Sequence, residues 1–202
     1  MTQRLILVTQ KLLLRSFESA DAEDVRRLAG DRAIADTTLG IPYPYEAGMA
    51  ERWISSHPDG FESGRLVVFA VVHRLSGELA GAVGLRVVRH YQRAELGFWV
   101  GRPFWNKGYC TEAGRVALDY GFATLGLNRI HASCFSRNPA SARVLQKLGM
   151  VYEGCARQHA KKWNRFEDIE FYGILKTKWE GEKPSVLTPM RDMGVNTYTP
   201  AG

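Results

Sequence analysis

The alternation of apolar and polar positions divides the chain into strands and helices. Apolar and polar residues alternate over residues 93–100, which predicts a half-buried strand. Residues 66–72 are apolar throughout, as expected for a central strand covered on both faces. Apolar residues recur at helical spacing over 113–120 and 140–148, which predicts two amphipathic helices. Taken along the whole chain, the pattern predicts strands at 12–17, 66–74, 79–88, 93–100, 129–135, 152–159 and 166–175, and helices at 20–29, 46–56, 111–125 and 139–148.

This order of elements is that of an α/β protein with a mixed sheet and no internal repeat. Ser76 and Gly77 suit a tight turn between two strands, and Asn164 suits a turn between the last two. Residues 181–202 are rich in Gly, Pro and Thr and have no periodicity. We expect them to form a tail that is either disordered or docked on a neighbouring chain, which leaves an oligomer open.

The composition is that of one globular domain without a membrane span. The 202 residues are 45% hydrophobic and 24% charged, and no apolar run approaches the roughly 18 residues of a transmembrane helix. The start of the chain lacks the apolar core and cleavage site of a signal peptide. The three cysteines form no C-x-x-C pair, so we expect no disulfide, no metal site and a cytoplasmic location.

The net charge of +6 suits an anionic cofactor, and it equally suits an encounter with RNA or the ribosome. The densest basic cluster comprises Arg157, Lys161, Lys162 and Arg165, with His159 and Trp163 between them. We interpret this cluster as the solvated turn of a hairpin. Contact with a substrate or with RNA is the alternative.

Residues 104–113 link the strand at 93–100 to the helix that follows. The first backbone N–H groups of a helix have no intrahelical partner, and the helix dipole adds positive potential there. Gly108 lets the backbone approach a ligand closely because it has no Cβ. The loop can therefore hold a phosphate or pyrophosphate through its N–H groups, although it matches neither G-x-x-x-x-G-K-[ST] nor G-x-G-x-x-G.

A second segment, residues 138–150, begins a helix with Asn138 as the N-cap and Pro139 at the first helical position, and ends it with Gly149. The two segments together resemble the cofactor motifs of the GNAT superfamily of acetyl-CoA-dependent N-acetyltransferases. Residues 105–110 correspond to Q/R-x-x-G-x-G/A, and residues 138–150 to N-x-x-[AS]-x-x-L-x-x-K-x-G-[FM]. The resemblance implies acetyl-CoA as the cofactor.

The resemblance narrows to the RimJ/RimL-like branch, the ribosomal-protein N-terminal acetyltransferases and their relatives. Residues 9–15 resemble its T-x-R-L-x-L-R opening with Lys11 in place of the arginine, residues 94–100 its A-E-[LI]-G-[YF]-x-[VL] strand, and residues 168–175 its D-x-x-x-Y-x-x-L ending. This implies a mostly antiparallel, splayed sheet with helices on both faces. We accordingly expect an N-terminal extension at 1–8, an N-acetyltransferase domain at 9–180 and the tail at 181–202.

The same resemblance implies which residues bind acetyl-CoA. They are Phe98, Trp99, Val100, Trp105, Asn106, Lys107, Gly108, Tyr109, Cys110, Thr111, Asn138 and Ser141. Trp105 and Cys110 depart from the family pattern in the loop. Leu145 stands where many members carry a tyrosine that acts as the general acid, so that role must fall elsewhere or be absent.

Acetyl transfer requires a neutral amine, a polarised thioester carbonyl and a proton for the leaving thiolate. Glu95 is the candidate base, because the family places acidic or water-relaying residues on this strand; the alternative is an arginine-paired strand carboxylate. The family's splayed sheet implies that a backbone N–H near Val100 holds the carbonyl. Ser141 is the candidate proton donor to the CoA sulfur, the alternative being a small packing residue. Asn138 is expected to bond the cofactor or the backbone, with a plain N-cap as the alternative.

Other reactive residues are expected to be structural. His131 is expected to be a satisfied structural histidine and Cys134 a core residue. Cys110 lies at a helix N-terminus, which lowers a thiol pKa, but no histidine partner is suggested nearby and a thiol nucleophile is not expected.

The leading interpretation is direct attack of an amine on acetyl-CoA, with no covalent enzyme intermediate. The acceptor is a protein N-terminal α-amine, or a small molecule such as an antibiotic, an amino acid or a polyamine. A domain that binds CoA or RNA without turnover is the alternative of another class.

Overall fold

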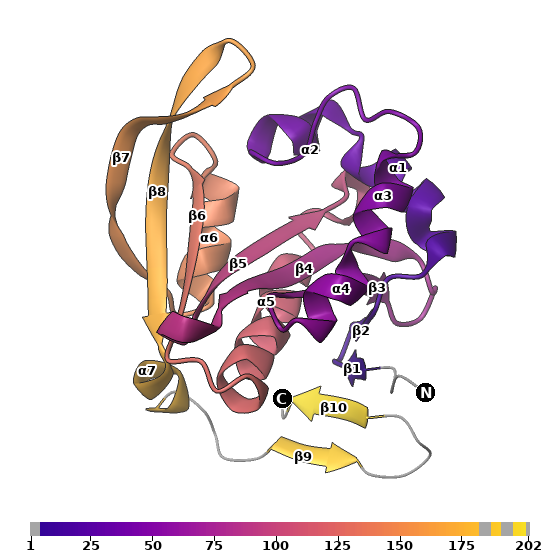
Figure 1. Cartoon of the computed structure of the whole chain (residues 1–202), viewed down its shortest axis with the longest axis vertical. Coiled ribbons are helices and arrows are strands. Elements are labelled where there is room, and N and C mark those ends of the chain that lie inside the picture. Colours follow the sequence, from indigo (N-terminus) through magenta and orange to yellow (C-terminus); the bar gives the residue numbers. More distant parts are fainter. Residues whose placement is uncertain (1–4, 182–186, 191–195, 201–202) are drawn as a thin grey trace.

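The computed structural model describes residues 5–181, 187–190 and 196–200. Its strands form one sheet in the order β7-β8-β6-β5-β4-β3-β2-β1-β10-β9 (Figure 1). Neighbouring strands are antiparallel except for β5 with β6 and β1 with β10, which are parallel. The sheet is therefore mixed and mostly antiparallel, as the resemblance implied.

The strands have the following bounds: β1 Leu5–Val8, β2 Leu12–Arg15, β3 Leu66–His73, β4 Leu79–Val88, β5 Arg93–Val100, β6 Arg129–Phe135, β7 Val151–Lys162, β8 Arg165–Leu175, β9 Leu187–Met190 and β10 Asn196–Pro200. The helices are α1 Ala22–Ala29, α2 Arg32–Thr37, α3 Met49–Ser55, α4 His57–Glu62, α5 Tyr109–Asp119, α6 Pro139–Lys147 and α7 Lys176–Gly181. A π-helical turn, Tyr120–Thr124, continues α5. Among the described residues, no helix is long and apolar enough to cross a membrane.

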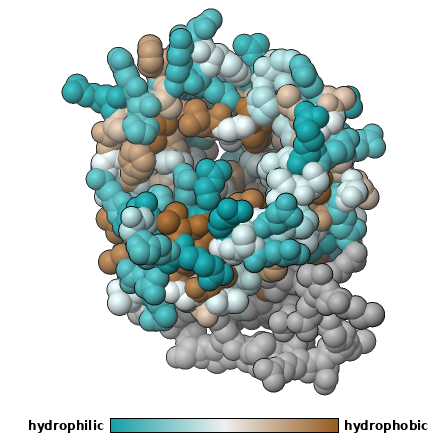
Figure 2. Space-filling model, viewed as in Figure 1, coloured by the Kyte–Doolittle hydropathy of each residue, from teal (hydrophilic) through white to brown (hydrophobic). Residues whose placement is uncertain are grey.

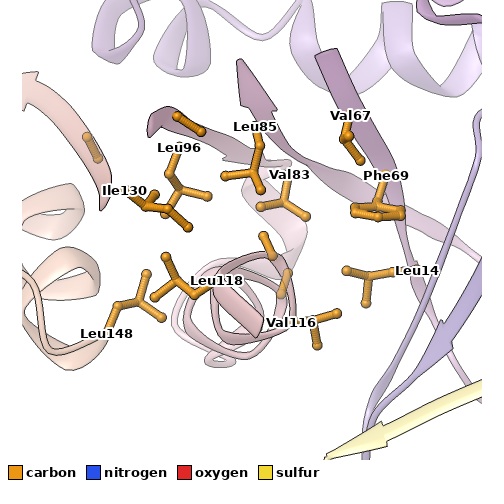
Figure 3. Close-up of a cluster of buried hydrophobic side chains, with 14 of the residues drawn as sticks. Leu14, Val67, Phe69, Val83, Leu85, Leu96, Val116, Leu118, Ile130 and Leu148 are labelled. Carbon is orange, nitrogen blue, oxygen red and sulfur yellow. The ribbon is translucent and has the colours of Figure 1, made fainter. Parts of the chain in front are cut away.

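Helices cover both faces of the sheet and enclose two apolar cores. The larger core lies between the sheet and α5 and α6, where Leu85, Leu96 and Ile130 meet Val116 and Leu118 (Figure 3). The smaller core lies on the opposite face, between the sheet and α1 and α3. The alternation of β5 matches this division, because its even-numbered residues enter the larger core or pack against it.

The sheet opens between β5 and β6. These strands pair only over residues 93–95 and 129–131, and beyond that they separate. β5 remains paired with β4 along its whole length. The separation leaves one side of the second half of β5 without a strand partner, and it fixes the position of the site described below.

Most predicted elements are present, with shifted ends. The helix predicted at 111–125 begins at Tyr109, directly after Gly108, which has a φ of +81°. The turn predicted at Asn164 is confirmed, but the hairpin strands on either side are longer than predicted. Two short helices, α2 and α4, were not predicted.

The sheet also extends beyond residues 9–180 at both ends. β1 falls in the predicted extension 1–8, and β9 and β10 fall in the predicted tail 181–202. Parts of both predicted segments, residues 1–4, 182–186, 191–195 and 201–202, lie outside the described residues.

Candidate active site

A cavity of about 430 Å³ lies where β5 and β6 separate. It is bounded by the end of β5, the loop before α5, the N-terminal turn of α5, and helices α6 and α2. The structure brings the predicted cofactor residues together here: Phe98, Trp99, Val100, Trp105, Asn106, Gly108, Tyr109, Cys110, Thr111, Asn138 and Ser141 all line the cavity. Lys107 does not line it, and its ammonium lies 5.4 Å from the centre of the Phe104 ring.

The loop before α5 has the geometry of an anion site. Asn106 and Gly108 both have left-handed backbones, with φ of +59° and +81°. Gly108 is the N-cap of α5 and has no side chain to cap the first N–H groups of the helix. A Cβ at Gly108 would meet no protein atom within 4 Å, so the space beside its backbone is open. Arg143 and Lys147 line the same cavity and add positive charge. These features fit a phosphorylated ligand.

The free side of β5 offers backbone groups to the cavity. Gly101 N–H donates to Ala80 on β4 at 2.8 Å, and bonding in an antiparallel pair alternates along the strand. The N–H and C=O groups of Phe98 and Val100 are therefore directed away from β4, toward the gap. The Val100 carbonyl accepts a 2.7 Å bond from Trp105 Nε1. The indole thus joins the loop to the end of the strand, which gives Trp105 a structural role.

Helix α6 presents Ser141 to the cavity from the side of the larger core. Asn138 Oδ1 accepts a 3.2 Å bond from Ser141 N, so Asn138 is the N-cap that the sequence indicated. Ser141 also interacts with the thiol of Cys134, a buried residue of β6. Burial raises the pKa of Cys134 to about 11, so this thiol is protonated near neutral pH. Leu145 is fully buried in the larger core and does not line the cavity.

Glu95 lies on the opposite face of the sheet, at the point where β5 and β6 begin to separate. Its side chain shares that face with Gly97 and Trp99, as the alternation predicted. Ser133 Oγ on β6 donates to Glu95 Oε1 at 3.5 Å. Glu95 does not line the cavity itself. A proton that passes between the cavity and this carboxylate therefore requires a relay such as water.

One expectation about the reactive side chains holds, and one needs revision. Burial raises the pKa of the Cys110 thiol to about 12, so desolvation outweighs the effect of the helix terminus and Cys110 is not a thiolate. His131 is not fully satisfied, because its Nδ1 is buried without a hydrogen-bond partner among the described residues. Burial lowers the pKa of His131, and the nearby Glu95 carboxylate opposes that effect.

One wall of the cavity was not predicted from the sequence. Ile34, Thr37 and Thr38, from α2 and the residue after it, line the cavity as well. Asp31 caps this helix by accepting a 2.8 Å bond from Ala33 N, and a capping aspartate is the one local signal that was available. The six residues of α2 are too few to show a helical period.

The basic cluster at the β7–β8 turn is not a uniformly solvated patch. Lys162 is 6% exposed and donates to the carbonyls of Ile41 at 2.7 Å and Leu39 at 3.3 Å. Trp163 is at the turn, and Arg32 of α2 lies 5.8 Å from the centre of its ring. The hairpin tip is therefore attached to α2 and the segment that follows it. In the space-filling view, this face of the molecule is hollowed near the middle of its upper half (Figure 2).

Within the described part of the chain, no group of three or more His, Cys, Asp or Glu side chains is arranged to hold a metal ion.

Comparison with known proteins agrees with this site. Residues 11–151 match the acetyltransferase (GNAT) domain family. The chain is 30% identical to the uncharacterised N-acetyltransferase p20 of Bacillus licheniformis, over 87% of this chain and 98% of that protein. It is 29% identical to YdaF of Bacillus subtilis, a candidate ribosomal N-acetyltransferase, over 87% of this chain and 97% of that protein. It is 28% identical to spermidine N(1)-acetyltransferase of Escherichia coli K12, over 70% of this chain and 73% of that protein. A GNAT acetyltransferase from Bacillus anthracis superposes with a TM-score of 0.75 at 26% identity, covering 86% of this chain and 99% of the other.

The chain belongs to the GNAT family of acetyltransferases. It is an acetyl-CoA-dependent N-acetyltransferase. The cavity fits this cofactor, because it combines an uncapped helix terminus, an open backbone approach at Gly108 and two cationic side chains. Acetyl-CoA supplies the acetyl group as a thioester.

Proposed function

We propose that the acceptor is a free α-amine at the N-terminus of a protein or peptide. The observation that carries this proposal is the charge of the cavity: among the described residues that line it there is no Asp or Glu. The nearest acid along α2, Asp36, is bonded to Arg137 at 3.0 Å. A polyamine would place a second ammonium group beside this cavity without a carboxylate partner, and an unpaired desolvated charge is costly.

The small number of acid–base groups near the cavity also favours an α-amine as the acceptor. An α-amine with a pKa of about 7.7–8.0 loses its proton at pH 7 at a cost of about 1 kcal/mol, whereas a lysine with a pKa of about 10.4 requires about 4.6 kcal/mol. Glu95 is the carboxylate closest to the separation of β5 and β6, and it acts through a relay. One such base is sufficient for an α-amine and poorly matched to lysine.

We assign roles to the residues around the gap as follows. Glu95, on one face, takes up the proton of the acceptor amine through water. The N–H of Val100 polarises the acetyl carbonyl from the free side of β5. Ser141, on the other face, holds the proton needed at the leaving sulfur. Gly108 and the first turn of α5 bind phosphate, and the amine attacks directly, without a covalent enzyme intermediate.

The names of the relatives point to more than one acceptor. YdaF is described as a candidate ribosomal N-acetyltransferase and another relative as a spermidine acetyltransferase. We favour a ribosomal protein as the acceptor. Exposed cations of the hairpin, such as Arg157 and Lys161, would attract the enzyme to the ribosome. This proposal includes a cytoplasmic location, where the three free cysteines would remain reduced.

The test measures thiol release from acetyl-CoA with matched acceptors. Short peptides with a free N-terminus are compared with the same peptides blocked at the N-terminus but bearing lysine, and with spermidine. The proposal expects faster acetylation of the free N-terminus than of either other acceptor. Equal rates on both peptides, or activity confined to small amines, would contradict it. No turnover on any amine, with CoA binding intact, would favour a binding module.

A further inference from the structure

Two walls of the cavity are joined by a cluster of charged side chains, Asp36, Arg137 and Glu167. Asp36 belongs to α2, between the lining residues Ile34 and Thr37. Arg137 directly precedes Asn138, which lines the cavity and caps α6. The cluster therefore connects the wall on the α2 side with the wall that carries Ser141.

Arg137 makes contacts in two directions. Its Nη1 donates to Asp36 Oδ2 at 3.0 Å, and its Nη2 donates to the Asp36 backbone carbonyl at 2.6 Å and to Oδ1 at 3.3 Å. Its Nε donates to Glu167 Oε2 on β8 at 2.8 Å. The guanidinium lies 4.9 Å from the centre of the Phe135 ring. All three nitrogens of the planar guanidinium therefore donate to a partner. Because the guanidinium is rigid, these bonds define the position of Asp36 relative to α6.

Glu167 anchors the cluster to the sheet. Its side chain is 5% exposed and also accepts a 2.6 Å bond from Arg165 Nε. Arg165 Nη2 lies 3.4 Å from Asp36 Oδ1. A carboxylate this buried, held by two arginines, is a rigid support, whereas a surface ion pair between flexible side chains contributes little.

We propose that Asp36, Arg137 and Glu167 form a positioning unit that holds the α2 wall against α6 and thereby sets the fit of the acceptor. None of the three lines the cavity, so they act through Ile34, Thr37 and Thr38. The phosphate loop precedes α5 and follows β5, and it includes no residue of α2. Loosening the unit should weaken acceptor binding and leave acetyl-CoA binding unchanged. This inference rests on the proposed function only in requiring that some amine is an acceptor.

The chain provides a matched control for the charged pair. Arg129 and Glu153 form a two-bond arginine–carboxylate pair at the other end of β6, and neither lines the cavity. Asp36→Asn and Glu153→Gln each remove one carboxylate charge from such a pair with little change in size. Only the first substitution touches the connection between the two walls.

The experiment measures KM for the acceptor, KM for acetyl-CoA and kcat in the wild-type enzyme, Asp36→Asn and Glu153→Gln. Any amine that the wild-type enzyme acetylates serves as the acceptor. The positioning unit predicts at least a fivefold rise in acceptor KM for Asp36→Asn, with acetyl-CoA KM within twofold, and no such rise for Glu153→Gln. Unchanged acceptor KM in Asp36→Asn, or equal rises in both KM values, would overturn the inference.

A second measurement separates positioning from general destabilisation. Arg137→Lys keeps the charge but loses the fork that spans Asp36 and Glu167. It should also raise acceptor KM while calorimetric affinity for CoA stays within twofold of wild type. Loss of CoA affinity in parallel would assign the cluster to folding and overturn the proposal. A different result would contradict the proposed function: the wild-type enzyme would prefer an amine other than a peptide N-terminus.

Discussion

Ser133 and Cys134 are neighbours in β6 whose side chains leave the strand on opposite faces of the sheet. Ser133 contacts Glu95 on one face, and Cys134 interacts with Ser141 on the other. The candidate base and the candidate acid are thus separated by the thickness of the sheet, at the gap between β5 and β6. An amine that attacks through this gap would lose its proton on one side while the leaving sulfur gains one on the other.

The first prediction concerns the base. Glu95→Gln should lower turnover mainly below pH 8, because the base matters most when the amine is largely protonated. Acetyl-CoA affinity should remain nearly unchanged. Rate profiles between pH 6 and 9.5 for wild type and variant would measure the effect, with Glu153→Gln as a control that removes another carboxylate from the same face. A parallel drop at every pH would identify Glu95 as a structural carboxylate.

The second prediction concerns the acid. Ser141→Ala should reduce kcat by about 10²-fold, the lower end of the range for general acid–base catalysis. Acetyl-CoA affinity should stay within a few-fold, because the backbone N–H that bonds to Asn138 is retained. Ser136→Ala, outside the cavity lining, is the control. A kcat within twofold of wild type in Ser141→Ala would show that this serine only packs in the helix.

The third prediction concerns the phosphate loop. Gly108→Val should weaken CoA binding at least tenfold, because its side chain would enter the open space beside the backbone. The substitution also strains a left-handed residue, so a control with the same strain is needed. Gly77 has a φ of +72° and equally open surroundings, in a turn outside the cavity lining. Gly77→Val should therefore lose stability without losing CoA affinity by calorimetry. Unchanged CoA affinity in folded Gly108→Val would remove the loop from the cofactor site.

Local pattern was sufficient for much of this site. The alternation over 93–100 indicated which face of β5 carries Glu95, and the Gly108 and Asn138 signals located two helix N-termini. Each of these features depends on residues close together in the chain, where spacing determines which face a side chain occupies. The order of predicted elements indicated an α/β fold with a mixed sheet, and the resemblance to the GNAT superfamily added that the sheet is mostly antiparallel.

The parts that could not be predicted depend on contacts between distant segments. Asp36 and Arg137 are 101 residues apart, and no local period relates them. Lys162 has the sequence context of a solvated turn but is buried against Leu39 and Ile41, 123 and 121 residues away. The α2 wall was missed for the same reason, since its position is set by the hairpin and by Arg137 rather than by its own six residues.

The last prediction concerns the dependence of stability on pH. His57 is 9% exposed, neither ring nitrogen has a hydrogen-bond partner among the described residues, and its ring packs against Trp53 at 4.5 Å between centres. Burial lowers the pKa of His57 from 6.5 to about 4. The unfolded chain therefore binds a proton in a range of pH where the folded protein does not. The resulting stabilisation is fully present above about pH 6.5, and it is lost progressively as the pH falls toward 4, by at most about 1.4 kcal/mol per pH unit.

His57→Phe would keep an aromatic ring beside Trp53 and Phe17 and remove this titration. The free energy of unfolding, measured with denaturant at pH 7.5 and at pH 5, should fall less in the variant than in the wild type. The exposed His90 offers a control, since His90→Phe should leave the wild-type dependence in place. Parallel losses in wild type and His57→Phe would mean that His57 gains a partner or water in solution, and that its burial does not control acid sensitivity.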